Sequence, residues 1–223
     1  MEWAGSLISI ITVNLLLSGD NALVIALASR QLPSEQQRQA VFWGGTGAIV
    51  LRIILTLAAI VLLKIPYLQL IGGFALLWIA IRLLTGDEDK HQDLEAKSCL
   101  WGAIKTIIAA DVVMSIDNVI AIAAVAKGDI ALLVVGLGIS IPIIIWGSKL
   151  IHRLMERWPV IITIGAAFLG WTAGDMAIGD QKIAPLLELY PWTDWGIPLA
   201  FAACVIVIGS VLSRRKHPDK NLS

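Results

Sequence analysis

The sequence predicts an all-α membrane protein of seven transmembrane helices, built as two inverted three-helix repeats plus one extra helix. Three observations predict this fold class: an apolar composition, seven long apolar runs and an internal repeat. Of the 223 residues, 57% are hydrophobic and 15% are charged, whereas soluble domains are about 45–50% apolar and about 25% charged. The mean hydropathy is +0.81. We therefore expect a single transmembrane domain spanning residues 1–223.

Seven stretches are long enough to cross a bilayer, which takes about 20 mostly apolar residues. Loop signals such as Pro33, Pro66 and Pro159 separate several of them. The predicted helices span about residues 6–29, 40–63, 67–85, 100–126, 130–149, 159–179 and 196–213. The charged segment 86–98 is the expected cytoplasmic linker. It separates a first repeat (about 6–85) from a second (about 100–179), and the seventh helix is left over.

The basic residues predict the orientation, because cytoplasmic loops carry an excess of lysine and arginine. With seven crossings, 13 basic residues fall on one side and 3 on the other. The N-terminus is therefore expected outside and the C-terminus in the cytoplasm. Tryptophans near the predicted helix ends, among them Trp101, Trp158 and Trp192, fit an interfacial aromatic belt.

An internal repeat relates the two halves of the chain. Residues 14–30 read NLLLSGDNALVIALASR, and residues 111–127 read DVVMSIDNVIAIAAVAK. A second match relates the stretch from Pro66 to Ala80 to the stretch from Pro159 to Ala173. Because each unit holds three crossings, the second copy enters the membrane from the opposite side. Inverted repeats of this kind place a transport site near the bilayer midplane.

Four ionisable residues fall inside predicted helices: Asp20, Arg52, Asp111 and Asp117. Each such residue costs about 2.5–3.5 kcal/mol at a helix centre, so intramembrane charges face the bundle interior and mark candidate functional sites. On a regular helix Asp111, Ser115 and Asn118 share one stripe, whereas Asp117 points about 100° away from Asn118. Both could meet at one point only if the helix were locally broken, and in the first copy Gly19 would ease such a break.

The polar residues of the two motifs offer carboxylate, amide and hydroxyl oxygens. These hard donors suit Mg²⁺, Ca²⁺ or Mn²⁺ rather than copper or zinc. The alternative for the serines and asparagines is interhelical hydrogen bonding. The candidate metal ligands are Asp20, Asn21, Asp111, Asp117, Asn118, Asn14, Ser18 and Ser115.

The charges of this cluster favour a divalent cation. Three aspartates and Arg52 sum to −2, which one divalent ion would neutralise. Without the ion, neighbouring carboxylates in a low dielectric should hold protons, which predicts proton–cation exchange. Arg52 has only hydrogen-bond donors and stays protonated, so we expect it to balance charge, with Asp111 as its partner.

The paired motifs NLLLSGDN and DVVMSIDN make the chain resemble the TerC family of integral membrane proteins, in its short YjbE/YkoY type. The resemblance covers essentially the whole chain. It implies manganese export across the bacterial cell membrane, with the acidic motifs forming the ion path. By position it points to Asn14, Asp20, Asn21, Asp111, Asp117 and Asn118. The second copy has Ile116 where the first has Gly19, so it lacks the glycine that would ease a helix break there.

Two other functions stay open from the sequence alone. One is export of a small organic solute, for which only Arg52 could pair with a carboxylate. The other is a non-transport membrane scaffold that assists metal loading or metal resistance. No enzyme activity is expected. The chain lacks the GxxxxGK[ST] motif, so it is not expected to hydrolyse ATP. No tightly bound cofactor and no nucleic acid partner are expected. The expected partners are the bilayer and a divalent ion such as Mn²⁺ as transported substrate, with a homo-oligomer left open.

Two further features are interpreted more simply. Gly170 and Gly174 are four residues apart, as in closely packed membrane helices. Asp175 lies at the outer end of the sixth predicted helix and is expected to be a solvated end, with a vestibule role as the alternative.

Overall fold

Long helices make up the fold in the computed structural model, which describes residues 11–12, 19–58, 62, 65–86, 96–126, 129–187 and 189–216. For some residues in these ranges, Asp117 among them, the structure describes the backbone but not the side chain. The helices are α2 (Gly19–Ser29), α3 (Ser34–Leu57), α5 (Leu68–Thr85), α6 (Ala96–Ala126), α7 (Ile130–Arg157), α8 (Val160–Ile178), α9 (Ala184–Leu187) and α10 (Thr193–Lys216).

Several helices extend beyond the ends predicted from hydropathy. Helix α3 begins at Ser34 rather than near residue 40, α6 at Ala96 rather than 100, and α7 ends at Arg157 rather than near 149. Hydropathy marks where the lipid should lie, whereas backbone hydrogen bonding continues into water through polar helix formers such as glutamine, glutamate and arginine. The start of the first predicted helix lies outside the described residues, but its predicted end at residue 29 matches α2.

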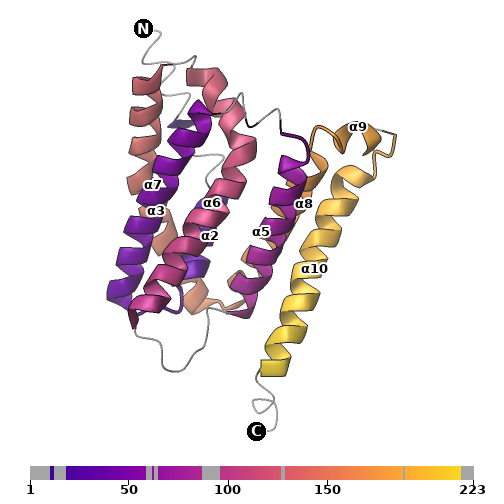
Figure 1. The fold of residues 1–223 in the computed structure, drawn as a ribbon. Helices are drawn as coiled ribbons and strands as arrows, with labels where there is room; N and C mark the ends of the chain where they lie inside the picture. Colours follow the sequence, from indigo (N-terminus) through magenta and orange to yellow (C-terminus); the bar gives the residue numbers. More distant parts are fainter. Residues whose placement is uncertain are drawn as a thin grey trace.

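The helices form two groups (Figure 1). Helix α3 packs against α6 and α7, and α2 packs against α7 and α6. In the second group α8 lies between α5 and α10 and contacts both. Helices α5 and α6 also touch and thereby join the groups. Helices from the two halves of the chain are thus interleaved rather than folded as separate bundles.

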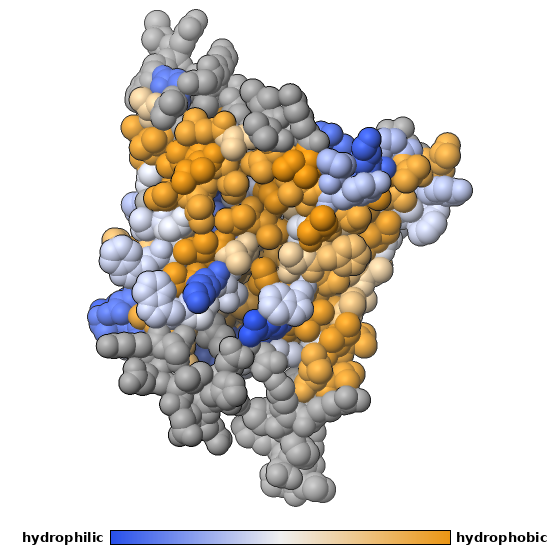
Figure 2. Space-filling view, viewed as in Figure 1, coloured by the Kyte–Doolittle hydropathy of each residue, from blue (hydrophilic) through white to orange (hydrophobic). Residues whose placement is uncertain are grey.

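The outer surface carries a broad apolar belt (Figure 2). Large apolar side chains are exposed along it, including Ile71 at 66%, Trp78 at 59% and Val207 at 61%. A soluble monomer rarely exposes so extended an apolar surface. Five helical segments are long and apolar enough to cross a membrane: Ser34–Leu57, Leu68–Thr85, Cys99–Ile116, Val160–Ile178 and Thr193–Leu212. The structure therefore confirms an all-helical membrane protein over the described ranges, while the total of seven crossings stays a prediction.

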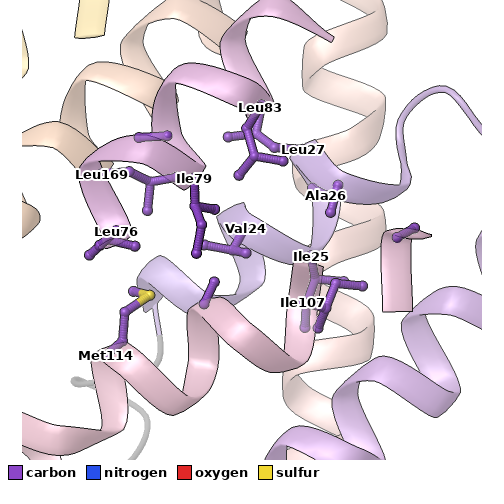
Figure 3. Packing of buried hydrophobic residues seen from close by; sticks show 14 of the residues in the cluster. Val24, Ile25, Ala26, Leu27, Leu76, Ile79, Leu83, Ile107, Met114 and Leu169 are labelled. Carbon is purple, nitrogen blue, oxygen red and sulfur yellow. The ribbon is translucent and has the colours of Figure 1, made fainter. Parts of the chain in front are cut away.

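The apolar core lies where α2, α5, α6 and α8 meet (Figure 3). Val24 and Leu27 of α2 face Ile79 and Leu83 of α5 there. Leu169 of α8 joins the same cluster and is fully buried. This apolar packing holds α2 against its neighbours, and α2 carries the first polar motif at its opening turn.

Gly170 and Gly174 confirm the prediction of close helix packing. A Cβ atom at Gly174 would lie 2.6 Å from the Cα of Pro198, and one at Gly170 would lie 2.9 Å from the Cα of Ala202. Both neighbours are backbone atoms of α10. Glycine is therefore required at these positions because α8 and α10 approach backbone to backbone.

Gly174→Ala is expected to destabilise the protein by about 1–3 kcal/mol, the usual cost of overpacking. The reason is that the added methyl group meets Pro198 backbone that cannot rotate away. Gly102→Ala is the matched control, because a Cβ there meets nothing within 4 Å. Thermal unfolding in detergent should show a lower midpoint for Gly174→Ala and no loss for Gly102→Ala. Equal midpoints would show that the two helices can separate without cost.

Candidate functional site

A buried ion pair joins α3 to α6. The Nη2 of Arg52 lies 2.5 Å from Asp111 Oδ1, and the two side chains are 1% and 8% exposed. Arg52 Nε donates a hydrogen bond of 2.9 Å to Ser115 Oγ. The Ser115 hydroxyl in turn donates to Asp111 Oδ2 at 3.3 Å. Asp111 and Ser115 lie one turn apart on α6, so a single helix face presents both to the guanidinium.

This network confirms the predicted pairing of Arg52 with Asp111. A buried ion pair is tolerated only when its geometry is good and when its remaining donors and acceptors also form hydrogen bonds. Both carboxylate oxygens of Asp111 have partners here. Thr56 also donates to the Arg52 carbonyl oxygen, at 2.7 Å. Arg52 is therefore anchored by both its side chain and its backbone, and removal of one charge would leave the other buried alone.

The first motif lies beside this pair. Helix α2 begins at Gly19, so Asp20 falls in its first turn. Asp20 is half-buried, and its Oδ1 accepts a hydrogen bond of 2.9 Å from the Asn21 backbone N–H. The charges of Arg52 and Asp111 both act on the Asp20 carboxylate. Three predicted site residues, from α2, α3 and α6, are thus brought together.

Asn21 is the unusual member of the site. It is 3% exposed, yet neither its Oδ1 nor its Nδ2 has a hydrogen-bond partner among the described residues. A buried amide without partners costs about 1–3 kcal/mol. A buried amide of this kind calls for an explanation, such as backbone strain, an ordered water or a bound ion.

The second motif lies within an uninterrupted helix. Helix α6 runs from Ala96 to Ala126 and passes through residues 111–118 without a break. The local break considered for both motifs therefore does not occur in α6. Asn118 is half-buried and has an interaction partner, whereas the side chain of Asp117 lies outside the description. Asn14 and Ser18 lie outside the described residues altogether.

The geometry divides the predicted ligands into two kinds. Asp111 and Ser115 both bind the Arg52 side chain, and Asp111 balances its charge. Asp20 and Asn21 lie next to this Arg52–Asp111–Ser115 network and offer oxygens that Arg52 does not bind. Over the described part of the chain, no group of three or more histidine, cysteine, aspartate or glutamate side chains could hold a metal ion. The described part of the site therefore offers a ligand the Asp20 carboxylate and the Asn21 amide, next to the Arg52 guanidinium that Asp111 holds in place.

Two further aspartates lie at the end of the bundle where α8 ends. Asp175 is exposed, as expected of a solvated helix end, and it lines a recess of about 480 Å³ together with Asp194. Asp180 was not recognised in the sequence. It is 2% exposed and accepts hydrogen bonds from the backbone N–H groups of Lys182 at 2.9 Å and Leu70 at 3.4 Å. These bonds hold the α8–α10 connection against the start of α5. In the sequence, only the Gly-Asp pair after a long apolar run could have indicated this role.

Exposed apolar helices around a buried arginine–aspartate network define an integral membrane protein with a polar centre. The model of the family described as "Integral membrane protein TerC family" matches residues 1–217, and the chain belongs to this family.

Relatives of this chain are themselves described as membrane proteins. The chain is 44% identical to the uncharacterized membrane protein YjbE of Bacillus subtilis over 91% of its own length and 92% of that protein. It is 25% identical to the uncharacterized membrane protein YkoY of the same organism, over 92% of this chain and 72% of the relative. The UPF0053 protein YegH of Escherichia coli is 27% identical, over 75% of this chain and 35% of that protein. No solved structure matches the chain.

Proposed function

We propose that this protein exports a divalent metal cation, with Mn²⁺ as its substrate, through a mid-membrane site formed by the SGDN and SIDN motifs. The observation that carries the proposal is the Asp20–Asn21 pair: a carboxylate and a buried amide, which has no partner among the described residues, lie beside the Arg52–Asp111 ion pair. Hard oxygen donors of this kind suit Mn²⁺ and similar ions. The cation would enter as cargo and leave again, so no resident cofactor is required.

Inverted repeats are part of this proposal, and the burial pattern of α5 and α8 supports them. Leu76 and its counterpart Leu169 are both 0% exposed. Ile71 and its counterpart Ile164 are 66% and 61% exposed. Corresponding positions thus share the same environment although they lie in different halves of the chain. Composition alone would match residue types but not their burial.

The helix contacts are also those expected of a two-fold relation. Helix α5 packs on α8, α2 on α6 and α3 on α7, and each of these pairs joins equivalent helices of the proposed repeats. The contact between α3 and α6 has its counterpart in the contact between α2 and α7. On this proposed arrangement a two-fold axis would relate the two SxDN motifs. We propose seven crossings of the bacterial cell membrane, with the N-terminus outside and the C-terminus in the cytoplasm.

The substrate charge follows from the charges of the cluster. Asp20, Asp111 and Arg52 sum to −1. The proposal requires Asp117 to contribute as well, which brings the sum to −2, although the unbroken α6 places Asp117 about 100° around the helix from Asn118. A divalent ion then leaves the site neutral, whereas an anionic solute would meet, among the described site residues, only Arg52, which is already paired with Asp111. This favours a metal cation over an organic solute.

Transport should be measured with the full chain in liposomes that contain a manganese-sensitive dye. We expect uptake of Mn²⁺ above that of protein-free liposomes, together with a change of internal pH if protons move in exchange. Mg²⁺, Ca²⁺ and amino acids are tested in parallel. Cytoplasmic manganese in cells with and without the protein provides a second measurement. Amino-acid transport without metal transport would favour the solute exporter, and no transport at all would favour the scaffold.

A further inference from the structure

A further cavity lies at the end of α2 opposite to the SGDN motif, which falls at the start of that helix. A cavity of about 270 Å³ opens where the last residue of α2, Ser29, meets α3 and α7. Arg38 of α3 and Lys149 and His152 of α7 line its polar part. None of these residues belongs to the site described above. The cavity is at the end of the bundle that the basic residues predict to be cytoplasmic.

The polar lining of this cavity offers donors and lacks acid groups. Arg38 and Lys149 are exposed and form no ion pair within the described part of the chain. His152 Nδ1 lies 3.4 Å from Glu156 Oε1, while its buried Nε2 has no partner among the described residues. No aspartate or glutamate lines the cavity itself. The chemistry therefore matches an anion with several oxygens, such as a phosphate group.

Apolar side chains make up much of the remaining lining, and Gln37, which also lines the cavity, donates from Nε2 to the Ser29 carbonyl oxygen at 3.4 Å. Val41 and Ile145 line it, as does Phe42, which is 50% exposed on the outer face of α3. The hydroxyl of Ser148 donates to the Ile145 carbonyl oxygen at 2.9 Å, and that of Ser29 donates to the Ile25 carbonyl oxygen at 2.7 Å. Both serine donors are thus already used within their own helices. A free phosphate ion would gain nothing from the apolar walls.

We propose that this cavity binds the headgroup of an anionic phospholipid. The phosphate would lie between Arg38 and Lys149, with the acyl chains against Phe42 and Ile145. Basic pockets between transmembrane helices on the cytoplasmic side are known to favour anionic lipids. Because Ser29, Val41 and Ser148 come from three different helices, the bound lipid would clamp α2 to α3 and α7. This proposal is independent of whether the SGDN motif transports a metal.

Lipid binding should be measured on the purified full chain in detergent, from the rise of the unfolding midpoint with added lipid. Phosphatidylglycerol, phosphatidylcholine and inorganic phosphate are compared. We expect phosphatidylglycerol to stabilise the wild-type protein most. In the Arg38→Gln/Lys149→Gln variant its apparent affinity should fall by about tenfold or more, since each basic residue contributes separately.

The control is Lys105→Gln/Arg153→Gln, which removes the same charge from exposed residues outside the cavity. An equal loss of affinity in this control would overturn the proposal, because a general surface potential would then explain the binding. Equal stabilisation by phosphatidylcholine, or the full effect from inorganic phosphate alone, would also overturn it. If the double variant without lipid has a lower unfolding midpoint than the wild type, the single Lys149→Gln variant is measured in its place and judged by the same criteria.

Discussion

Asp20→Asn and Asp117→Asn are each expected to abolish manganese export while leaving membrane insertion intact. Asparagine keeps the size and one oxygen donor of aspartate but removes one unit of charge. The proposed cluster then sums to −1, so a divalent ion would be held with uncompensated positive charge in a low dielectric, which is strongly unfavourable. The measurement is Mn²⁺ uptake into liposomes at matched protein content. Membrane insertion is checked from the protein recovered in the membrane fraction.

Asp175→Asn is the matched control, because it makes the same change in the cavity that Asp175 shares with Asp194, away from the SxDN motifs. This variant should keep most of the transport activity. The shared two-carboxylate site would be wrong if either motif variant transported normally. Loss of transport in Asp175→Asn as well would indicate that a charge required for transport lies at the Asp175 end of the bundle.

Arg52→Ala is expected to damage folding or transport severely. It would leave the carboxylate of Asp111, which is 8% exposed, buried without its countercharge. Removing one partner of a buried ion pair costs about 3–5 kcal/mol. The unfolding midpoint in detergent and Mn²⁺ uptake should therefore both fall. Arg153→Ala removes an exposed arginine from α7 and should leave both close to wild type.

The double variant Arg52→Ala/Asp111→Asn tests the pairing directly. It removes both charges, so stability should recover in part relative to Arg52→Ala alone. The rescue is only partial because Ser115 also loses the Arg52 Nε donor. A double variant no more stable than Arg52→Ala would show that Arg52 acts through something other than Asp111.

Much of the site was predictable because charge inside a membrane is costly and therefore rare. Asp20, Arg52 and Asp111 are conspicuous in apolar runs, and only one of them is positive. The opposite charges predicted the Arg52–Asp111 pair, which the structure contains. The interior position of Gly170 and Gly174 was likewise predictable, because small residues four apart lie on one helix face.

The sequence by itself determined the membrane class and which residues are buried charges, since both depend on composition along a single helix. Three-dimensional packing decided the rest. Helix ends such as Arg157 depend on hydrogen bonds that continue into water. The Asn21 amide has no partner among the residues that the structure describes, and this depends on which side chains of other helices come close. The cavity between Arg38 and Lys149 joins residues 111 positions apart in the chain. Such contacts are set by how α2, α3 and α7 pack together, and hydropathy along the chain carries no information about that packing.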